Sequence, residues 1–166
     1  QASTTATIDG WSLKERACFL CPANQPVEER GIPFGDDLVV LPNPAPITPL
    51  HLVLASRRHV DQTLDGCLDA AIAFALATAG HLTVLYNGPR CGASAPDHLH
   101  LQAFESGSAP DERALRGGRI LGRSEELTMT SHRGSSRHVL ELCGTEIAVA
   151  NGVRAAVRVI GEALSA

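Results

Sequence analysis

The sequence predicts an α+β protein built from an antiparallel sheet and two helices. Two stretches show helical periodicity, and the β-rich runs of the chain stand before the first stretch and between the two. The composition is typical of a folded core, because 44% of the 166 residues are hydrophobic and 19% are charged. The sequence contains no internal repeat and no run of about 18 apolar residues. We therefore expect one domain that does not span a membrane.

Two predicted strands precede the first helix. Residues 37–41 are β-rich and end at a cluster of prolines, which a central strand does not tolerate. Residues 51–55 form the second strand and lead into a turn at 56–59. An apolar helical pattern covers residues 61–79, and Gly80 is predicted to be its C-cap.

Two further strands follow the helix. Residues 82–86 are predicted to be the third strand, because a turn signal follows them directly. Residues 92–97 form a loop of small residues, and residues 98–104 form the fourth strand. We expect residues 1–104 to be the core of the domain, with its chemistry on the last of these strands.

Residues 105–166 are expected to complete the same domain as a loop-rich extension. Residues 105–137 are rich in Gly, Ser and Arg and are predicted to be mainly surface loop, with one helical turn near 111–116. A strand at 138–142 and a final helix from Gly144 or Thr145 to about residue 164 end the pattern.

Charge and cysteine content exclude some classes of function. A net charge of −4 argues against a general nucleic-acid-binding protein, which usually carries a basic stripe. The number of cysteines, five, is odd, and only Cys18 and Cys21 form a close pair. This pattern does not resemble a secreted disulfide framework and favours a reducing cytoplasm. No targeting signal is recognisable after Gln1, which is compatible with a trimmed or processed chain.

The segment His-Leu-His-Leu-Gln at residues 98–102 is the strongest candidate for chemistry. In a strand, His98, His100 and Gln102 share one face, about 6.5–7 Å apart, while the leucines between them point to the other. The alternation also fits a half-exposed strand with two ordinary histidines. Because the histidines and the glutamine directly follow a Gly/Ser/Pro loop, we favour a functional site.

The residue types of this segment suit phosphoryl chemistry. A neutral imidazole such as that of His100 is a nucleophile at neutral pH and can attack a phosphorus atom. The Gln102 side chain cannot act as an acid, but its amide can donate to a phosphoryl oxygen and stabilise charge there.

Residues 92–102 resemble the active-site signature of the transferase branch of the histidine-triad superfamily. This branch contains galactose-1-phosphate uridylyltransferase, the diadenosine tetraphosphate phosphorylases and the GDP-hexose phosphorylases. Its members have His-x-His-x-Gln where the hydrolase branch has three histidines. The resemblance implies a histidine-triad-like antiparallel sheet with one helix packed between strands and a C-terminal helix. It also implies that His100 becomes covalently nucleotidylated.

Residues 18–24 resemble the zinc-knuckle segment of the uridylyltransferases. Two cysteines spaced as Cys18 and Cys21 can hold one zinc ion, and two further ligands are needed. The resemblance implies that His59 and His98 supply them, which gives a closed structural Cys2His2 site. The alternative is an unliganded pair of reduced thiols.

Other residues are matched to substrate contacts by the same resemblance. Asn43 lies where the superfamily contacts the ribose, and Asn87 matches an asparagine near the phosphates, although an ordinary turn asparagine explains it almost as well. Gly92 and Ser94 can present a backbone N–H group and a hydroxyl to phosphate oxygens. For His51, a site role and an ordinary place at a strand end remain equally open.

The resemblance implies a nucleotidyltransferase or phosphorylase that acts on a nucleoside-diphosphate sugar or a dinucleoside polyphosphate. Two alternatives remain: a histidine-triad nucleotide hydrolase, and a non-catalytic, zinc-stabilised nucleotide-binding module. The expected partner is a small-molecule nucleotide, without nucleic acid or membrane, and a homodimer is possible. The phosphorylases extend further than the resemblance does, so a shortened relative or a piece of a longer chain is expected.

Overall fold

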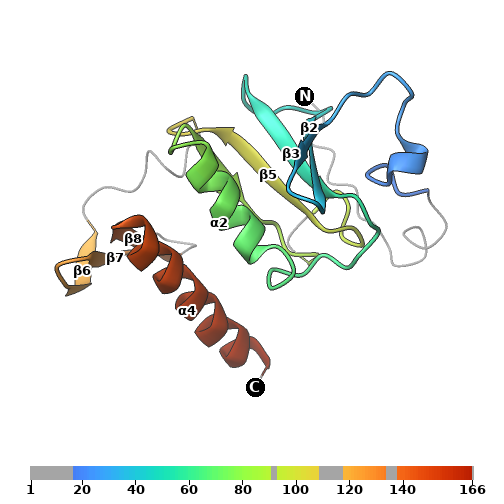
Figure 1. The fold of residues 1–166 in the computed structure, drawn as a ribbon. Coiled ribbons are helices and arrows are strands. Elements are labelled where there is room, and N and C mark those ends of the chain that lie inside the picture. The colour runs from blue at the N-terminus through green and yellow to red at the C-terminus, as the bar shows by residue number, and fades with distance from the viewer. Residues whose placement is uncertain (1–16, 91–92, 109–117, 134–137, 166) are drawn as a thin grey trace. The chain divides into compact units, whose positions relative to one another are not determined.

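A computed structural model describes residues 17–90, 93–108, 118–133 and 138–165 of the chain (Figure 1). Its elements in chain order are η1 (Pro22–Asn24), β1 (Ile32–Phe34), β2 (Leu38–Pro42), β3 (His51–Ser56), α2 (Leu68–Ala77), β4 (Leu82–Leu85), β5 (His100–Glu105), β6 (Arg119–Arg123), β7 (Leu127–Arg133), β8 (His138–Gly144) and α4 (Glu146–Ser165).

The strands form two sheets, with the order β1-β2-β3-β5-β4 in the larger and β6-β7-β8 in the smaller. The pairs β1–β2, β2–β3 and β3–β5 are antiparallel, as are both pairs of the smaller sheet. The predicted α+β class with an antiparallel sheet and a C-terminal helix is therefore confirmed. The chain divides into two compact units, residues 1–71 with 84–104 and residues 72–83 with 105–166.

Strands β3 and β5 form the centre of the larger sheet, and their register positions the candidate site. Ala55 pairs with His100, and Val53 pairs with Gln102. Successive side chains of a strand point to opposite faces, so His100 and Gln102 share a face with these two β3 residues. Leu54 lies on the opposite face and is fully buried. A strand buried on both faces explains the nearly continuous apolar sequence of β3.

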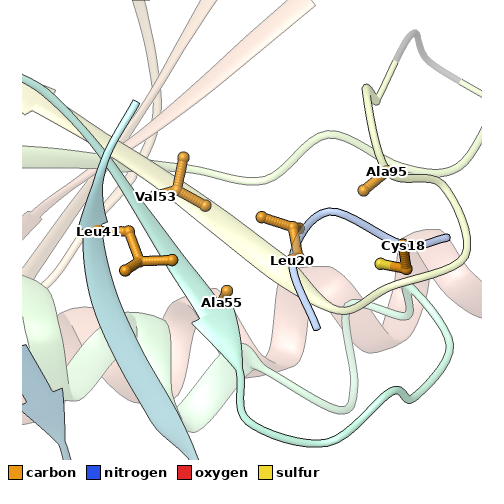
Figure 2. Packing of buried hydrophobic residues seen from close by; sticks show 6 residues of the cluster. All are labelled: Cys18, Leu20, Leu41, Val53, Ala55 and Ala95. Carbon is orange, nitrogen blue, oxygen red and sulfur yellow. The ribbon is translucent and has the colours of Figure 1, made fainter. Parts of the chain in front are cut away.

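A hydrophobic cluster joins the segment before η1 to one face of the sheet (Figure 2). Cys18 and Leu20 come from that segment, and Ala95 comes from the loop before β5. These three pack with buried side chains of β2 and β3, namely Leu41, Val53 and Ala55. The cluster fixes the segment that carries Cys18 against the sheet.

The first helix is shorter than the pattern at 61–79 predicts, because α2 begins at Leu68 and ends at Ala77. Residues 61–67 instead form an irregular segment, and Gln62 within it uses its side chain to bind the backbone of β5. The helix ends at Ala77, two residues before the predicted end, and Ala79 (φ +49°) and Gly80 (φ +77°) follow it in the left-handed conformation that ends many helices.

The prediction of surface loop is wrong for residues 119–123 and 127–133, which form β6 and β7. Most side chains of β6 are exposed, and those of β7 include Thr, Ser, His and Arg, so their composition resembles that of a loop. Cross-strand pairing, of β6 with β7 and of β7 with β8, specifies these strands more than hydrophobic content does. The helical turn predicted near 111–116 lies outside the described residues. In the part of the chain that is described, no helix is long and apolar enough to cross a bilayer.

Candidate metal centre and adjoining pocket

Four side chains that can bind a metal converge beside the hydrophobic cluster. Cys18 and Cys21 flank a tight turn, in which the Cys21 N–H donates to the Cys18 carbonyl. His59 follows β3, and His98 precedes β5. Their sulfur and nitrogen ligand atoms all lie within 4.8 Å of one another. The cluster is therefore compatible with a metal ion, and it consists of the four residues expected as ligands.

The separations fit a tetrahedral ion. Cys18 Sγ lies 3.3 Å from His98 Nδ1, and Cys21 Sγ lies 3.3 Å from His59 Nδ1. The two imidazole Nδ1 atoms are 3.2 Å apart, and Cys21 Sγ is 3.6 Å from His98 Nδ1. Ligands bound tetrahedrally at about 2.0–2.3 Å are spaced about 3.3–3.8 Å from one another. Four of the six separations are thus close to those of a tetrahedral site, and all six are at most 4.8 Å.

Groups behind the two histidines orient them for binding. His98 Nε2 lies 2.8 Å from the Ser56 carbonyl oxygen, which can only accept, so Nε2 carries the hydrogen and Nδ1 keeps its lone pair for a metal. Asp97 Oδ2 lies 3.9 Å from His59 Nε2, so a carboxylate stands behind the second imidazole. Carbonyl and carboxylate partners of this kind are typical of metal-binding histidines.

Burial shifts the pKa values of two residues of the cluster, His98 and Cys21. It lowers the pKa of His98, and the neighbouring His59 and His100 lower it further, against the effect of the hydrogen bond to Ser56. Burial likewise raises the pKa of the Cys21 thiol, and the adjacent Cys18 and Asp97 act in the same direction. Without a cation, these side chains therefore favour their neutral forms.

A pocket of about 510 Å³ adjoins this cluster. Phe19 and Leu20, the residues next to Cys18 in the turn that ends at Cys21, line it, so one short segment serves both the metal cluster and the pocket wall. Its polar lining includes side chains from β3, β5 and the loops next to them: Asn43, His51, Ser94, His100 and Gln102. Its apolar lining includes Leu41, Pro42, Ile47 and Val53.

His100 is the most buried polar side chain of this lining, with 3% of its surface exposed. Its Nδ1 lies 2.8 Å from the His98 carbonyl oxygen and therefore carries the hydrogen. Its Nε2 keeps a lone pair and has no hydrogen-bond partner among the described residues. Burial lowers the pKa of His100 more than the bond to His98 raises it, which favours the neutral imidazole. An unprotonated, unpartnered nitrogen is suited to nucleophilic attack.

Two residues support His100 and Gln102 from outside the expected set. Gln62 is buried and binds both backbone groups of His100. His51 lies 2.7 Å from Gln102, between Nε2 and Oε1. A helical pattern concealed the role of Gln62. The signal for His51 was its place at the start of a strand, but the register that brings it to Gln102 had to come from the structure.

The remaining expected substrate residues divide into three cases. Asn43 and Ser94 line the pocket together with His100 and Gln102. Asn87 is half-buried, and its carbonyl oxygen accepts a hydrogen bond from Gln62. Gly92 lies outside the described residues.

The fold and site define an α+β protein with a Cys2His2 cluster, compatible with a metal ion, beside a pocket that contains a buried histidine. The chain belongs to the family described as a domain of unknown function (DUF4922), whose model matches residues 1–105. The match includes every residue of the metal cluster and of the pocket lining. No curated protein and no solved structure matches the chain.

Proposed function

We propose that this protein is a nucleotidyltransferase of the phosphorylase type, within the transferase branch of the histidine-triad superfamily. Its substrate is a nucleoside-diphosphate sugar or a dinucleoside polyphosphate. The observation that carries the proposal is the buried Nε2 of His100, which lacks a partner among the described residues and belongs to a side chain of the pocket lining. The resemblance of residues 92–102 to the active-site signature supplies the reaction class.

In the first half-reaction, the lone pair of His100 Nε2 attacks the α-phosphorus of the substrate. A P–N bond forms, and the bond between the α-phosphorus and the bridging oxygen breaks. The leaving group departs as a phosphorylated sugar or a nucleotide, with the bonding electrons on its oxygen. The His98 carbonyl accepts from Nδ1–H and stabilises the positive charge that develops on the imidazole.

In the second half-reaction, inorganic phosphate attacks the same phosphorus. The P–N bond breaks, the electron pair returns to His100 Nε2, and a nucleoside diphosphate leaves. Gln102 lines the pocket next to His100 along β5 and donates from its amide to a phosphoryl oxygen in both steps. The hydrolase branch has a third histidine at the position of Gln102. Because the Gln102 amide is not a general acid, it favours phosphorolysis over hydrolysis.

The metal of the Cys2His2 cluster is proposed to be zinc with a structural role. Two thiolates and two imidazoles form a ligand set that zinc prefers, and four protein ligands leave no open position for catalysis. Zinc bound there joins the turn of Cys18 and Cys21 to the loop before β5. The pocket wall at Phe19 and Leu20 is thereby held next to His100.

A reducing cytoplasm is the proposed location. The four described cysteines, Cys18, Cys21, Cys67 and Cys143, form no disulfide. Two of them belong to the metal cluster and must stay reduced to bind a metal as thiolates, which a reducing compartment allows.

A substrate screen tests the reaction class. The protein is incubated with nucleoside-diphosphate sugars and dinucleoside polyphosphates, with and without inorganic phosphate, and the nucleotide products are separated. The proposal predicts a nucleoside diphosphate that appears only with phosphate. A nucleoside monophosphate formed equally in both conditions identifies a hydrolase, and tight binding of nucleotides without any product identifies a binding module.

A further inference from the structure

His51, at the start of β3, contacts the pocket residues Asn43 and Gln102. We infer that His51 is a positioning residue that fixes Gln102 with its amide NH2 group toward the bound phosphoryl group. The inference rests on the proposed function for the identity of the ligand, but the orientation of Gln102 follows from hydrogen bonds within the chain.

A backbone donor decides the tautomer of His51. The Ile47 N–H donates to His51 Nδ1 at 3.2 Å, so Nδ1 carries no hydrogen. In a neutral imidazole the hydrogen is then on Nε2. The His51 ring is fixed by packing, because His51 is only 6% exposed. It contacts the Phe104 ring edge to face, with the ring centroids 6.4 Å apart.

The tautomer of His51 in turn decides the orientation of Gln102. His51 Nε2–H donates to Gln102 Oε1 at 2.7 Å. The carbonyl oxygen of the Gln102 amide is thus held by β3, and its NH2 group remains for the pocket. Without a donor at position 51, the amide has no such preference and can present either its oxygen or its nitrogen to a ligand.

Asn43 is oriented in the same way by a second backbone donor. The Ala45 N–H donates to Asn43 Oδ1 at 2.9 Å, which leaves the Asn43 NH2 group 3.1 Å from His51 Nε2. Because both of these nitrogens carry hydrogens, this approach is not a hydrogen bond. The Asn43 NH2 group keeps its hydrogens for an acceptor supplied by a ligand.

The result is a donor site for an oxyanion. Asn43 and Gln102 both present NH2 groups, and the described lining of the pocket contains no lysine or arginine. Neutral donors that are fixed before the ligand binds stabilise a phosphoryl oxygen without reorganisation. We therefore expect the Asn43 NH2 group to donate to a phosphoryl oxygen of the ligand. The resemblance implies a contact to the ribose instead.

A double-mutant cycle tests this role. The affinity for a nucleoside 5′-monophosphate is measured by calorimetry in the wild type, His51→Phe, Gln102→Ala and the double variant. His51→Phe is expected to weaken binding about 10-fold in the wild-type background, which is the size of effect that one hydrogen bond has. In the Gln102→Ala background it is expected to change the affinity less than about 2-fold, because its target is gone. Equal losses in the two backgrounds would overturn the inference.

Two further variants keep the test decisive if His51→Phe does not fold. His51→Gln retains a donor for Gln102 Oε1 and is expected to bind within about 3-fold of the wild type. Gln102→Glu still accepts from His51 but offers no donor, so it is expected to lose affinity at least as much as Gln102→Ala. Wild-type affinity in Gln102→Glu contradicts the inference.

The measurement also separates this inference from the proposed reaction. Nucleoside monophosphate binding with the expected cycle, but without turnover of any substrate, supports the role of His51 and rejects the transferase. Where turnover is found, His51→Phe is expected to lower kcat/KM at least about 10-fold, and His51→Gln is expected to retain kcat/KM within about 3-fold of the wild type. Absence of monophosphate binding in the wild type rejects the donor site itself.

Discussion

The side chain of Gln62 binds both backbone groups of His100, as a neighbouring strand would. Its Oε1 accepts from the His100 N–H at 2.7 Å, and its Nε2 donates to the His100 carbonyl at 3.0 Å. Nε2 also donates to the Asn87 carbonyl, and the Tyr86 hydroxyl donates to the Gln62 carbonyl. A single side chain thus satisfies both backbone groups of the proposed nucleophile, at the point where β5 begins.

Replacing this side chain should destabilise the protein. Gln62→Ala leaves the buried N–H and C=O groups of His100 without these partners, and we expect a loss of about 2–4 kcal/mol in the free energy of unfolding. Urea unfolding measures it. Gln25→Ala is the matched control, because Gln25 makes one hydrogen bond to the Leu20 carbonyl and is only half-buried. A loss in Gln62→Ala no larger than in the control would contradict this role.

The metal cluster predicts one metal ion per chain. We expect Cys18→Ser and Cys21→Ser to reduce the bound metal from about one equivalent to near zero and to lower the melting temperature. Elemental analysis and thermal unfolding measure both. Cys143→Ser is the control, since that cysteine is exposed on β8 and outside the cluster. Full metal content in Cys18→Ser would reject the proposed ligand set.

Removal of the metal should also weaken nucleotide binding. Phe19 and Leu20 line the pocket from the same turn that carries Cys18. Chelation is therefore expected to reduce affinity for a nucleoside monophosphate at least about 10-fold, by releasing that wall. Affinity is measured before chelation, after it and after zinc is restored. Unchanged affinity in the metal-free protein would show that nucleotide binding in the pocket does not depend on the metal, which would contradict this prediction.

Cys67 predicts a loss of stability in alkali. Burial, with a smaller effect of Asp65, raises the pKa of its thiol to about 11 in the folded protein. The ordinary thiol of the unfolded chain ionises first, so the contribution of Cys67 is complete below about pH 8.5 and is lost as the pH rises toward 11. Unfolding free energies of wild type and Cys67→Ala, compared from pH 8 to pH 10.5, should converge. A constant difference would contradict the raised pKa.

The fold class and the positions of most core elements could be predicted from local patterns. The alternation at residues 98–102 and the β-rich run at 51–55 are properties of one segment at a time, and strands β3 and β5 lie there, although β5 begins at His100 rather than at His98. Burial at residues 98–101 does not follow the alternation, because His98, His100 and the leucines between and after them are all buried. The ligand set of the metal cluster was accessible through resemblance to a known signature, and the four side chains do come together.

The rest depends on contacts between segments. Gln62 lies 38 positions before His100, and nothing in its own surroundings shows which backbone it binds. His51 and Gln102 are 51 positions apart, and only the register of β3 and β5 brings them together. Strands β6 and β7 were missed because pairing with neighbouring strands, rather than a continuous apolar sequence, specifies them.

The most direct test of the central claim is the mass of the intact protein after incubation with substrate in the absence of an acceptor. Wild-type protein should gain the mass of one nucleotidyl group, and the gain should be lost when phosphate is added and in His100→Ala. His81→Ala is the control, because His81 is exposed and lies outside the pocket. An adduct that persists in His100→Ala, or a wild type that never gains mass with any substrate it converts, would contradict a covalent route through His100.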